Sequence, residues 1–175
     1  DGEQEMTLKG PSNATLTLDW NIDGRQIVGG YFDKSIRLWD VESRTVLSEF
    51  RHTTSELTSV AWHPHLARLA VGSRSDPLSV WESDGTTVSG WTGPRGHVYE
   101  AAWDPIGGRL AAVGYDGKLR LWNAEGNAAD EFTSGEPMTS VAWKPDGTQL
   151  ATGLDSGAIQ LWQPDGRPDA LLKGH

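Results

Sequence analysis

The chain has 175 residues, of which 15 are basic and 24 acidic, giving a formal net charge of −9. A surface of this sign repels phosphate backbones, and no run of eighteen apolar residues occurs, so we expect neither a nucleic-acid nor a membrane partner. The absence of cysteine excludes disulfides and thiolate metal sites, while 21 glycines and nine prolines favour short strands joined by tight turns.

Eight tryptophans recur in two phased sets. The first set is Trp20, Trp62, Trp103 and Trp143, and the second is Trp39, Trp81, Trp122 and Trp162. Both sets repeat at intervals of 42, 41 and 40 residues, and the two members of each pair are 19 residues apart. A period near forty residues indicates one supersecondary unit that is copied four times.

Each unit predicts the same succession of strands. The first strand alternates apolar and polar residues and ends at the first tryptophan, after which Pro, Asp and Gly predict a turn. The second strand is a short apolar run that closes in glycine, at Gly29, Gly72, Gly114 and Gly153. The third strand ends at the second tryptophan and is predicted at Ser35–Trp39, Leu78–Trp81, Lys118–Trp122 and Ala158–Trp162.

A fourth strand is marked by one large apolar residue that follows the second tryptophan by about ten residues, at Phe50, Trp91, Phe132 and Leu172. Four antiparallel strands per unit make one blade of a β-propeller. We therefore predict an all-β fold of four four-stranded antiparallel blades in a single unit, residues 1–175. The blades are expected at about 14–50, 57–91, 98–132 and 138–173, with a surplus outer strand at 4–9.

Four phrases that end the third strands carry a family resemblance: IRLWD at 36–40, LSVWE at 78–82, LRLWN at 119–123 and IQLWQ at 159–163. With the hairpins that precede them, they resemble the WD-repeat β-propeller family over nearly the whole chain. The resemblance implies an Asp in the turn after the second strand, which stands at Asp33 and Asp116 and is replaced by Ser75 and Ser156. The Gly-His that the family places before the first strand is clear only at Gly174-His175, so tryptophan packing is expected to provide most of the rigidity.

Four blades in a row leave one apolar flank bare at each end, which a protein surface rarely tolerates. Two chains could pair around a two-fold axis, the remaining repeats could lie on another polypeptide, or four blades could close on themselves. Because the family usually forms rings of seven or eight blades, we favour a half-propeller that closes an eight-bladed ring as a homodimer.

The sequence gives little support for a catalytic site or a metal site. His63 and His65 flank Pro64 in a turn and could contact one metal, but no third ligand stands at a metal-site spacing, and exposed turn histidines are the simpler interpretation. Asp33, Asp76, Asp116 and Asp155 recur in turns, where capping explains them better than acid–base catalysis. We expect no catalytic residue, no metal and no cofactor.

The function predicted first is a noncatalytic scaffold that binds a protein or peptide on its top face, where the turns after the second strands meet the connections between blades. Aromatic and Arg residues are enriched in such interfaces. The candidates are Tyr31, Phe32, Arg74, Arg95, His97, Tyr99, Tyr115 and Leu154. The alternative is a self-associating structural half-propeller without a ligand; a channel-bound small molecule or an enzyme activity ranks third. The sequence leaves the cellular compartment undetermined, although the lack of a visible signal sequence and of cysteine favours the cytoplasm.

Overall fold

Antiparallel β-strands build the described part of the molecule. The computed structural model describes residues 8, 10, 14–51, 54–88 and 97–174, and strands are the regular elements found there. Within those ranges no helix is long and apolar enough to cross a membrane. The all-β, antiparallel class expected from the sequence is confirmed.

The strands form four sheets, each contiguous in the sequence and ordered as in the chain. The first sheet contains β1 (Thr15–Trp20), β2 (Gln26–Tyr31), β3 (Ser35–Asp40) and β4 (Thr45–Arg51). The second contains β5 (Leu57–Trp62), β6 (Arg68–Ser73) and β7 (Ser79–Glu82). The third contains β8 (Val98–Trp103), β9 (Arg109–Gly114), β10 (Lys118–Asn123) and β11 (Ala128–Thr133). The fourth contains β12 (Met138–Trp143), β13 (Leu150–Leu154), β14 (Ile159–Trp162) and β15 (Pro168–Leu172).

The second sheet has three strands in the described part of the chain, where four were expected. The chain turns back after β7, where Trp81 bridges Thr87 and the Val88 N–H donates to the Val80 carbonyl at 2.9 Å. The fourth strand expected at Trp91 lies outside the described residues, and so does almost all of the surplus strand expected at 4–9.

The first hairpin of every sheet has the same irregularity. The pairing of the first with the second strand shifts register between Thr15 and Thr17 in the first sheet, and between Leu57/Ser59, Val98/Glu100 and Met138/Ser140 in the others. A bulge of this kind increases the local twist of the strand. The shift lies between five and three residues before the first tryptophan in every sheet, so the four first hairpins are equivalent.

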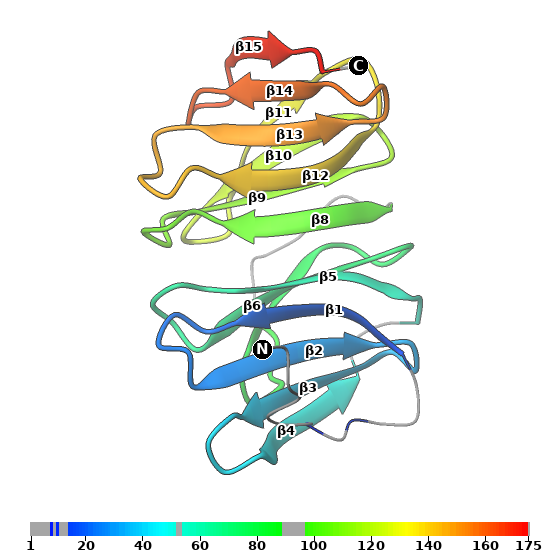
Figure 1. Ribbon diagram of the computed structural model, residues 1–175, viewed down its shortest axis with the longest axis vertical. Helices are drawn as coiled ribbons and strands as arrows, with labels where there is room; N and C mark the ends of the chain where they lie inside the picture. Colours follow the sequence, from blue (N-terminus) through cyan, green and yellow to red (C-terminus); the bar gives the residue numbers. More distant parts are fainter. Residues whose placement is uncertain (1–7, 9, 11–13, 52–53, 89–96, 175) are drawn as a thin grey trace, which may run out of the picture.

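The first strands of the sheets lie next to one another at the centre of the molecule (Figure 1): β1 contacts β5, β5 contacts β8, and β8 contacts β12. The remaining strands of each sheet run outward from there. In the view of Figure 1 the first sheet extends downward from β1 to β4 and the fourth extends upward from β12 to β15. The sheets therefore radiate from a common centre, as blades do.

Apolar side chains fill the space between consecutive sheets. The first and second sheets share a cluster that includes Val28, Ile36, Val60 and Leu69, and similar clusters lie at the next two junctions. The large residue of the fourth strand packs on the third-strand tryptophan of the next sheet. Phe50 stacks on Trp81 at 5.4 Å between ring centroids, and Phe132 lies 6.5 Å from Trp162. The tryptophan period thus marks the packing between sheets.

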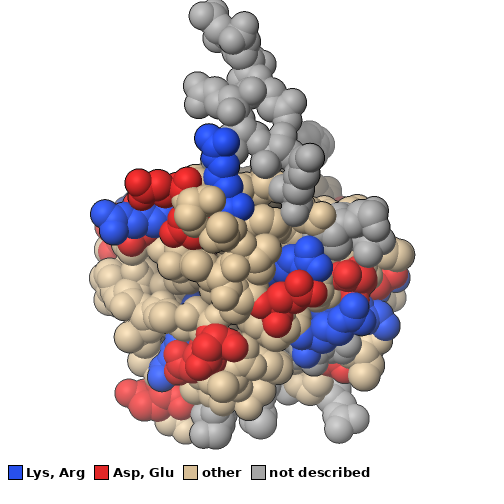
Figure 2. Space-filling view, turned by 90° about the horizontal axis from the view of Figure 1, so that it is seen from below, with Lys and Arg blue, Asp and Glu red and all other residues tan. Residues whose placement is uncertain are grey.

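The surface carries both signs of charge. Figure 2, seen from the side of the outer strand β4, shows Lys and Arg interspersed with Asp and Glu among uncharged residues. Several of these charges are paired across neighbouring strands, such as Arg37 with Glu49 at 3.0 Å. The net negative charge is therefore not gathered into one acidic patch on this side.

Candidate protein-interaction surface

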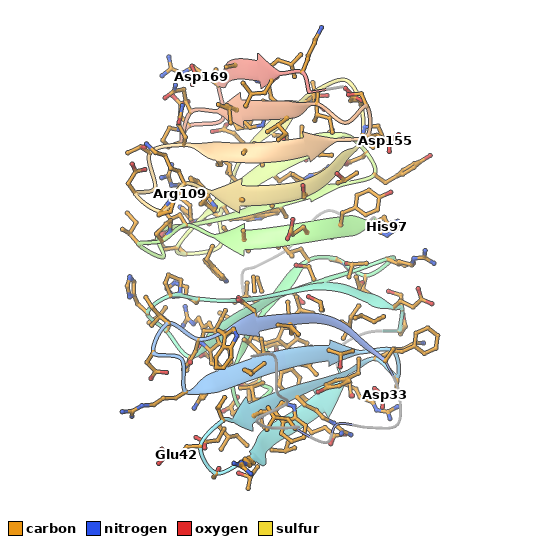
Figure 3. All side chains as sticks on the ribbon, viewed as in Figure 1. Asp33, Glu42, His97, Arg109, Asp155 and Asp169 are labelled. Carbon is orange, nitrogen blue, oxygen red and sulfur yellow. The ribbon has the colours of Figure 1, made fainter. Side chains whose placement is uncertain are left out.

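One edge of the sheets collects two kinds of loop. Figure 3 shows Asp33 and Asp155, from the β2–β3 and β13–β14 turns, on the same edge as His97, which precedes β8. Arg109, Glu42 and Asp169 lie at the opposite edge. We call the edge of the β2–β3, β6–β7, β9–β10 and β13–β14 turns the top face. It is the face on which the sequence placed its binding candidates.

Strand register makes the tips of the four top-face turns equivalent. The pairing of first and second strands aligns the residues that follow β2, β6, β9 and β13, namely Phe32, Arg74, Tyr115 and Asp155. All four are exposed: Phe32 to 56%, Tyr115 to 67%, and the Arg74 side chain to 58%. Each sheet therefore presents one side chain at the same place on the top face.

Two predicted contact residues are buried instead. Tyr31 is 6% exposed, and its hydroxyl accepts a hydrogen bond from Trp39 Nε1 at 3.1 Å. Leu154 is also 6% exposed and packs with Met138 and Val141. Both stand one position before a turn tip, and successive residues of a strand point to opposite sides, so their side chains turn into the packing. The prediction that Tyr31 and Leu154 are surface contacts is therefore wrong. Arg95, which was also predicted as a contact, lies outside the described residues.

Four of the candidates come together between the second and third sheets. The His97 and Tyr99 rings lie 4.4 Å apart, and the Tyr115 N–H donates to the His97 carbonyl at 3.1 Å. Partial burial, and then the positive charge of Arg74, lower the pKa of His97 below its ordinary value of 6.5. The imidazole is therefore neutral at neutral pH. Arg74, His97, Tyr99 and Tyr115 form what we call the top-face cluster; Phe32 belongs to a different sheet.

Polar contacts fix the top-face loops to each other. Asp76 accepts hydrogen bonds from the Ser55 N–H at 3.1 Å and from the Ser55 hydroxyl at 2.6 Å, and these bonds lower the pKa of Asp76. In the fourth sheet the serine and the carboxylate have exchanged places. Ser156 lies in the β13–β14 turn, and its hydroxyl donates to Glu136, which precedes β12, at 3.0 Å. Sequence reasoning missed Ser55 and Glu136, since the connections between sheets differ in sequence. Their only signal is that each precedes a first strand by a few residues.

The Asp of the family pattern stays within its own turn. Asp33 accepts hydrogen bonds from the Ser35 N–H at 3.1 Å and the Ser35 hydroxyl at 2.6 Å, which lower its pKa. Asp116 accepts from the Lys118 N–H at 3.2 Å and pairs with Arg120. These carboxylates cap turns, as the sequence suggested, and each lies in a different sheet.

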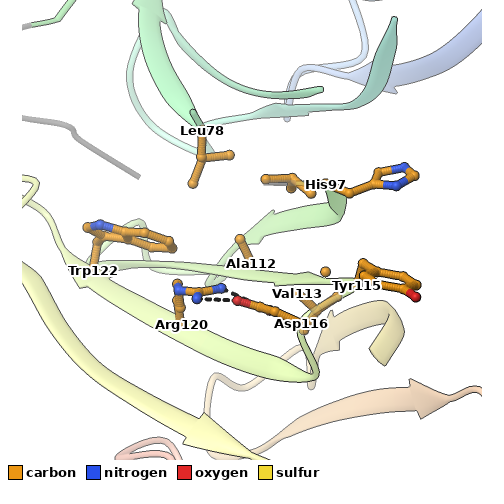
Figure 4. Close-up of a pocket in the computed structure, with 10 residues that line it drawn as sticks. Leu78, His97, Ala112, Val113, Tyr115, Asp116, Arg120 and Trp122 are labelled. Atoms are coloured by element: carbon orange, nitrogen blue, oxygen red, sulfur yellow. Dashed lines mark hydrogen bonds and ion pairs between the residues drawn. The ribbon is translucent and has the colours of Figure 1, made fainter. Parts of the chain in front are cut away.

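A small apolar pocket opens beneath the top-face cluster (Figure 4). Leu78, Ala112 and Trp122 line it, and the Asp116–Arg120 ion pair lies at its side. At the junctions on either side, the equivalent space beside the third-strand tryptophan is filled by Phe50 or Phe132. In the sequence the residue that corresponds to them is Trp91, which lies outside the described residues.

His63 is a structural residue, against the expectation of two exposed turn histidines. It is 5% exposed, and its Nδ1 accepts hydrogen bonds from the N–H groups of His65 and Leu66 at 3.0 and 3.1 Å. The proton is therefore on Nε2, which donates to the Gly107 carbonyl in the third sheet at 3.1 Å. Both ring nitrogens are in use, and the described residues hold no group of three side chains that could bind a metal.

Family models match most of this chain. A model described as "WD domain, G-beta repeat" matches residues 44–87, 85–123 and 131–163, and "Anaphase-promoting complex subunit 4 WD40 domain" matches residues 5–65. The first match starts at the outer strand β4 and continues through the second sheet, so one sequence repeat spans a junction between two sheets.

Curated relatives share shorter stretches. "Periodic tryptophan protein 2 homolog" of Schizosaccharomyces pombe is 31% identical over 80 residues, 46% of this chain and 9% of that protein. "Probable cytosolic iron-sulfur protein assembly protein 1" of Kluyveromyces lactis is 36% identical over 70 residues, 37% of this chain and 21% of that protein. This chain thus spans only a minor part of the relatives that it matches.

A solved structure shares the fold. A chain in the "Crystal Structure of Mitotic Checkpoint Complex" superimposes with a TM-score of 0.82 at 24% identity, over 94% of this chain and 52% of that chain. The four sheets therefore have the arrangement of propeller blades. Together with family models that match well over half of the residues, this arrangement shows that the chain belongs to the WD-repeat family.

Proposed function

We propose that the chain is a noncatalytic scaffold that binds a protein or peptide through its top face. The observation that carries the proposal is the top-face cluster, which combines the exposed side chains of Tyr115 and Arg74 with the half-buried rings of His97 and Tyr99 at the junction of the second and third sheets. Such side chains supply much of the binding energy in protein interfaces. WD-repeat relatives in general serve as platforms for protein interaction, which agrees with this role.

The mechanism is rigid presentation. Asp76 and Glu136 tie the top-face loops together, and each turn tip extends directly from a buried strand. A partner therefore meets side chains whose backbone is already fixed, and less conformational entropy is lost on binding. Tyr115 provides the aromatic contact. The exposed guanidinium of Arg74, which pairs with Glu56 at 3.3 Å, provides hydrogen-bond donors for a polar or acidic group of the partner.

The experiment selects partners from a displayed library of random peptides on the 175-residue chain. Peptides are expected to lose at least tenfold in affinity when Tyr115→Ala or Arg74→Ala replaces the wild type. Ile106→Ala is the matched control, because Ile106 is 70% exposed in the β8–β9 turn at the opposite edge. Thermal melting should be unchanged in all three variants.

Two results would refute the proposal. One is a set of selected peptides that bind the Tyr115→Ala and Arg74→Ala variants as tightly as the wild type. The other is a loss of folding in those variants, which would assign both side chains to the structure. Self-association, the alternative raised by the sequence, involves the flanks of the terminal sheets and none of these residues.

A further inference from the structure

The third-strand tryptophan of three sheets donates its indole N–H to a hydroxyl group. The pairs are Trp39 with Tyr31 at 3.1 Å, Trp81 with Ser79 at 2.9 Å, and Trp162 with Thr152 at 2.9 Å. A buried donor without an acceptor costs free energy, and the same bond recurs although three different residues supply the hydroxyl.

The third sheet has none of these hydroxyls beside its tryptophan. Strand pairing places Ala112 at the position of Thr152, and it places Arg120 at the position of Ser79. A methyl group and a guanidinium offer no acceptor. Within the described part of the chain, the indole N–H of Trp122 makes no hydrogen bond.

The first sheet shows which kind of group fits this place. The ring of Tyr31 is buried, and its hydroxyl lies beside Gly29, where a Cβ would approach it to 3.0 Å. Gly29 is the equivalent of Ala112. The third sheet has Gly114 at the position of Tyr31, and a Cβ there would lie 2.2 Å from the His97 carbonyl oxygen. The third sheet therefore cannot supply a tyrosine of its own.

The pocket beneath the top-face cluster lies at this place in the third sheet. Ala112 and Trp122 line it, Leu78 lies across from them, and the ion pair of Asp116 with Arg120 lies at its side (Figure 4). Its volume is about 120 Å³. An apolar cavity of roughly 150 Å³ holds benzene, so a single six-membered ring is the size of group that fits.

The lining distinguishes among the side chains that could enter. A phenylalanine ring would fill the apolar space but leave the Trp122 N–H without an acceptor. A carboxylate would lose its hydration against apolar walls and would meet the charge of Asp116. Tyrosine combines a ring of the right size with a hydroxyl that accepts a hydrogen bond. Its backbone would then lie beside Tyr115 and His97, which also line the pocket.

We propose that the pocket binds a tyrosine side chain of the protein or peptide partner. The hydroxyl accepts the Trp122 N–H beside Ala112, as the Tyr31 hydroxyl accepts that of Trp39 in the first sheet. This inference rests on the proposed function, because the tyrosine belongs to a partner that is bound at the top-face cluster. It adds the identity of the side chain that anchors the partner.

Analogues of the side chain test the pocket without a peptide. p-Cresol, the analogue of tyrosine, should bind the 175-residue chain with a dissociation constant of roughly 1 mM. Toluene, the analogue of phenylalanine, should bind about tenfold more weakly, because it leaves the indole N–H unpaired. Titrations followed in ¹H–¹⁵N spectra measure both, and the indole signal missing from Trp122→Phe identifies Trp122. The preference for p-cresol should disappear in Trp122→Phe, and equal binding of both analogues to the wild type would overturn the proposal.

Substitutions at Ala112 close the pocket. Ala112→Thr places the hydroxyl of Thr152 at the equivalent position, so it should accept the Trp122 N–H, shift the Trp122 indole signal and abolish p-cresol binding. Ala112→Val is the matched control, because it has nearly the same shape without the hydroxyl. It should weaken p-cresol binding but leave the indole signal near its wild-type position. Trp91→Ala should leave the affinity for p-cresol unchanged, and clearly tighter binding would assign the pocket to Trp91 and overturn the proposal.

Peptides selected on the top face complete the test. Replacing their tyrosine by phenylalanine should lower the affinity for the wild type about tenfold and leave that for Trp122→Phe unchanged, a coupling that indicates direct contact. Peptides that require Tyr115 and Arg74 but bind Ala112→Thr as tightly as the wild type would overturn the inference and leave the proposed function intact. Binding of p-cresol that Ala112→Thr abolishes, without any selected peptide, would count against the proposed function alone.

Discussion

Replacing His63 tests how one side chain joins two sheets. His63→Ala removes the acceptor of two turn N–H groups and the donor to the Gly107 carbonyl, together with the ring that lies 4.6 Å from Trp103. Each hydrogen bond contributes about 1 kcal/mol, and the loss of the buried ring adds about 1 kcal/mol. Because turn groups can partly rehydrate, we expect a loss of about 3 kcal/mol in the free energy of unfolding, which lowers Tm by roughly 6–12 °C.

The matched variant is His63→Asn. The first sheet has Asn21 at the equivalent position, where Oδ1 accepts the N–H groups of Arg25 and Gln26 at 3.0 and 2.9 Å. The equivalent N–H groups at position 63 belong to Ala67 and Arg68, so an Asn there can form two turn bonds in place of those from His65 and Leu66, while losing the bond to Gly107 and the ring contact. We expect about half of the loss caused by Ala, roughly 1.5 kcal/mol. Urea unfolding followed by tryptophan fluorescence measures both.

The pH dependence gives a second readout. Burial lowers the pKa of His63 below 6.5, so the unfolded chain binds a proton more readily than the folded protein. The stability that this histidine contributes is fully present above about pH 6.5 and is lost as the pH falls through its lowered pKa, with a slope of at most about 1.4 kcal/mol per pH unit. The difference between wild type and His63→Asn should therefore shrink between pH 7 and pH 5. Equal stabilities of the Ala and Asn variants, or a difference that does not change with pH, would refute the reasoning.

Two further substitutions probe the turns. Gly107→Ala should destabilise more than Gly147→Ala: both residues have positive φ, near 70°, but a Cβ at Gly107 would lie 2.4 Å from His63 whereas the nearest atom at Gly147 is 3.9 Å away. Chemical unfolding should show that Gly147→Ala lowers the free energy of unfolding by about 1 kcal/mol, the cost of the backbone conformation alone, and that Gly107→Ala lowers it clearly more. Equal losses in the two variants would contradict the contact between position 107 and His63. Asp76→Asn should cost about 1 kcal/mol at neutral pH, since the hydrogen bonds from Ser55 lower the pKa of Asp76. The stability that Asp76 contributes is present above about pH 3.8 and is lost as the pH falls through its lowered pKa. The melting temperatures of the wild type and Asp76→Asn should therefore converge in acid. A difference in melting temperature that stays constant with pH would contradict the role of Asp76.

The sequence by itself determined the number and order of the sheets. Strand alternation, turn residues and the spacing of tryptophans are local patterns, and they fixed the third strands to within a residue or two of Ser35–Asp40, Ser79–Glu82, Lys118–Asn123 and Ile159–Trp162. The family resemblance is confirmed for the same reason. The equivalence of Asp33 with Ser75 also holds, because strand pairing aligns them.

Only the tertiary structure decided which side chains are free to bind. Tyr31 and Phe32 are neighbours in the sequence, yet Tyr31 is buried and Phe32 is exposed. The bulge in β1 and the strand register set the direction of each side chain. His63 meets a carbonyl 44 residues away, a contact that no local pattern contains. Contacts between sheets depend on how the strands twist and stack, and a short window of sequence carries no information about its distant neighbour.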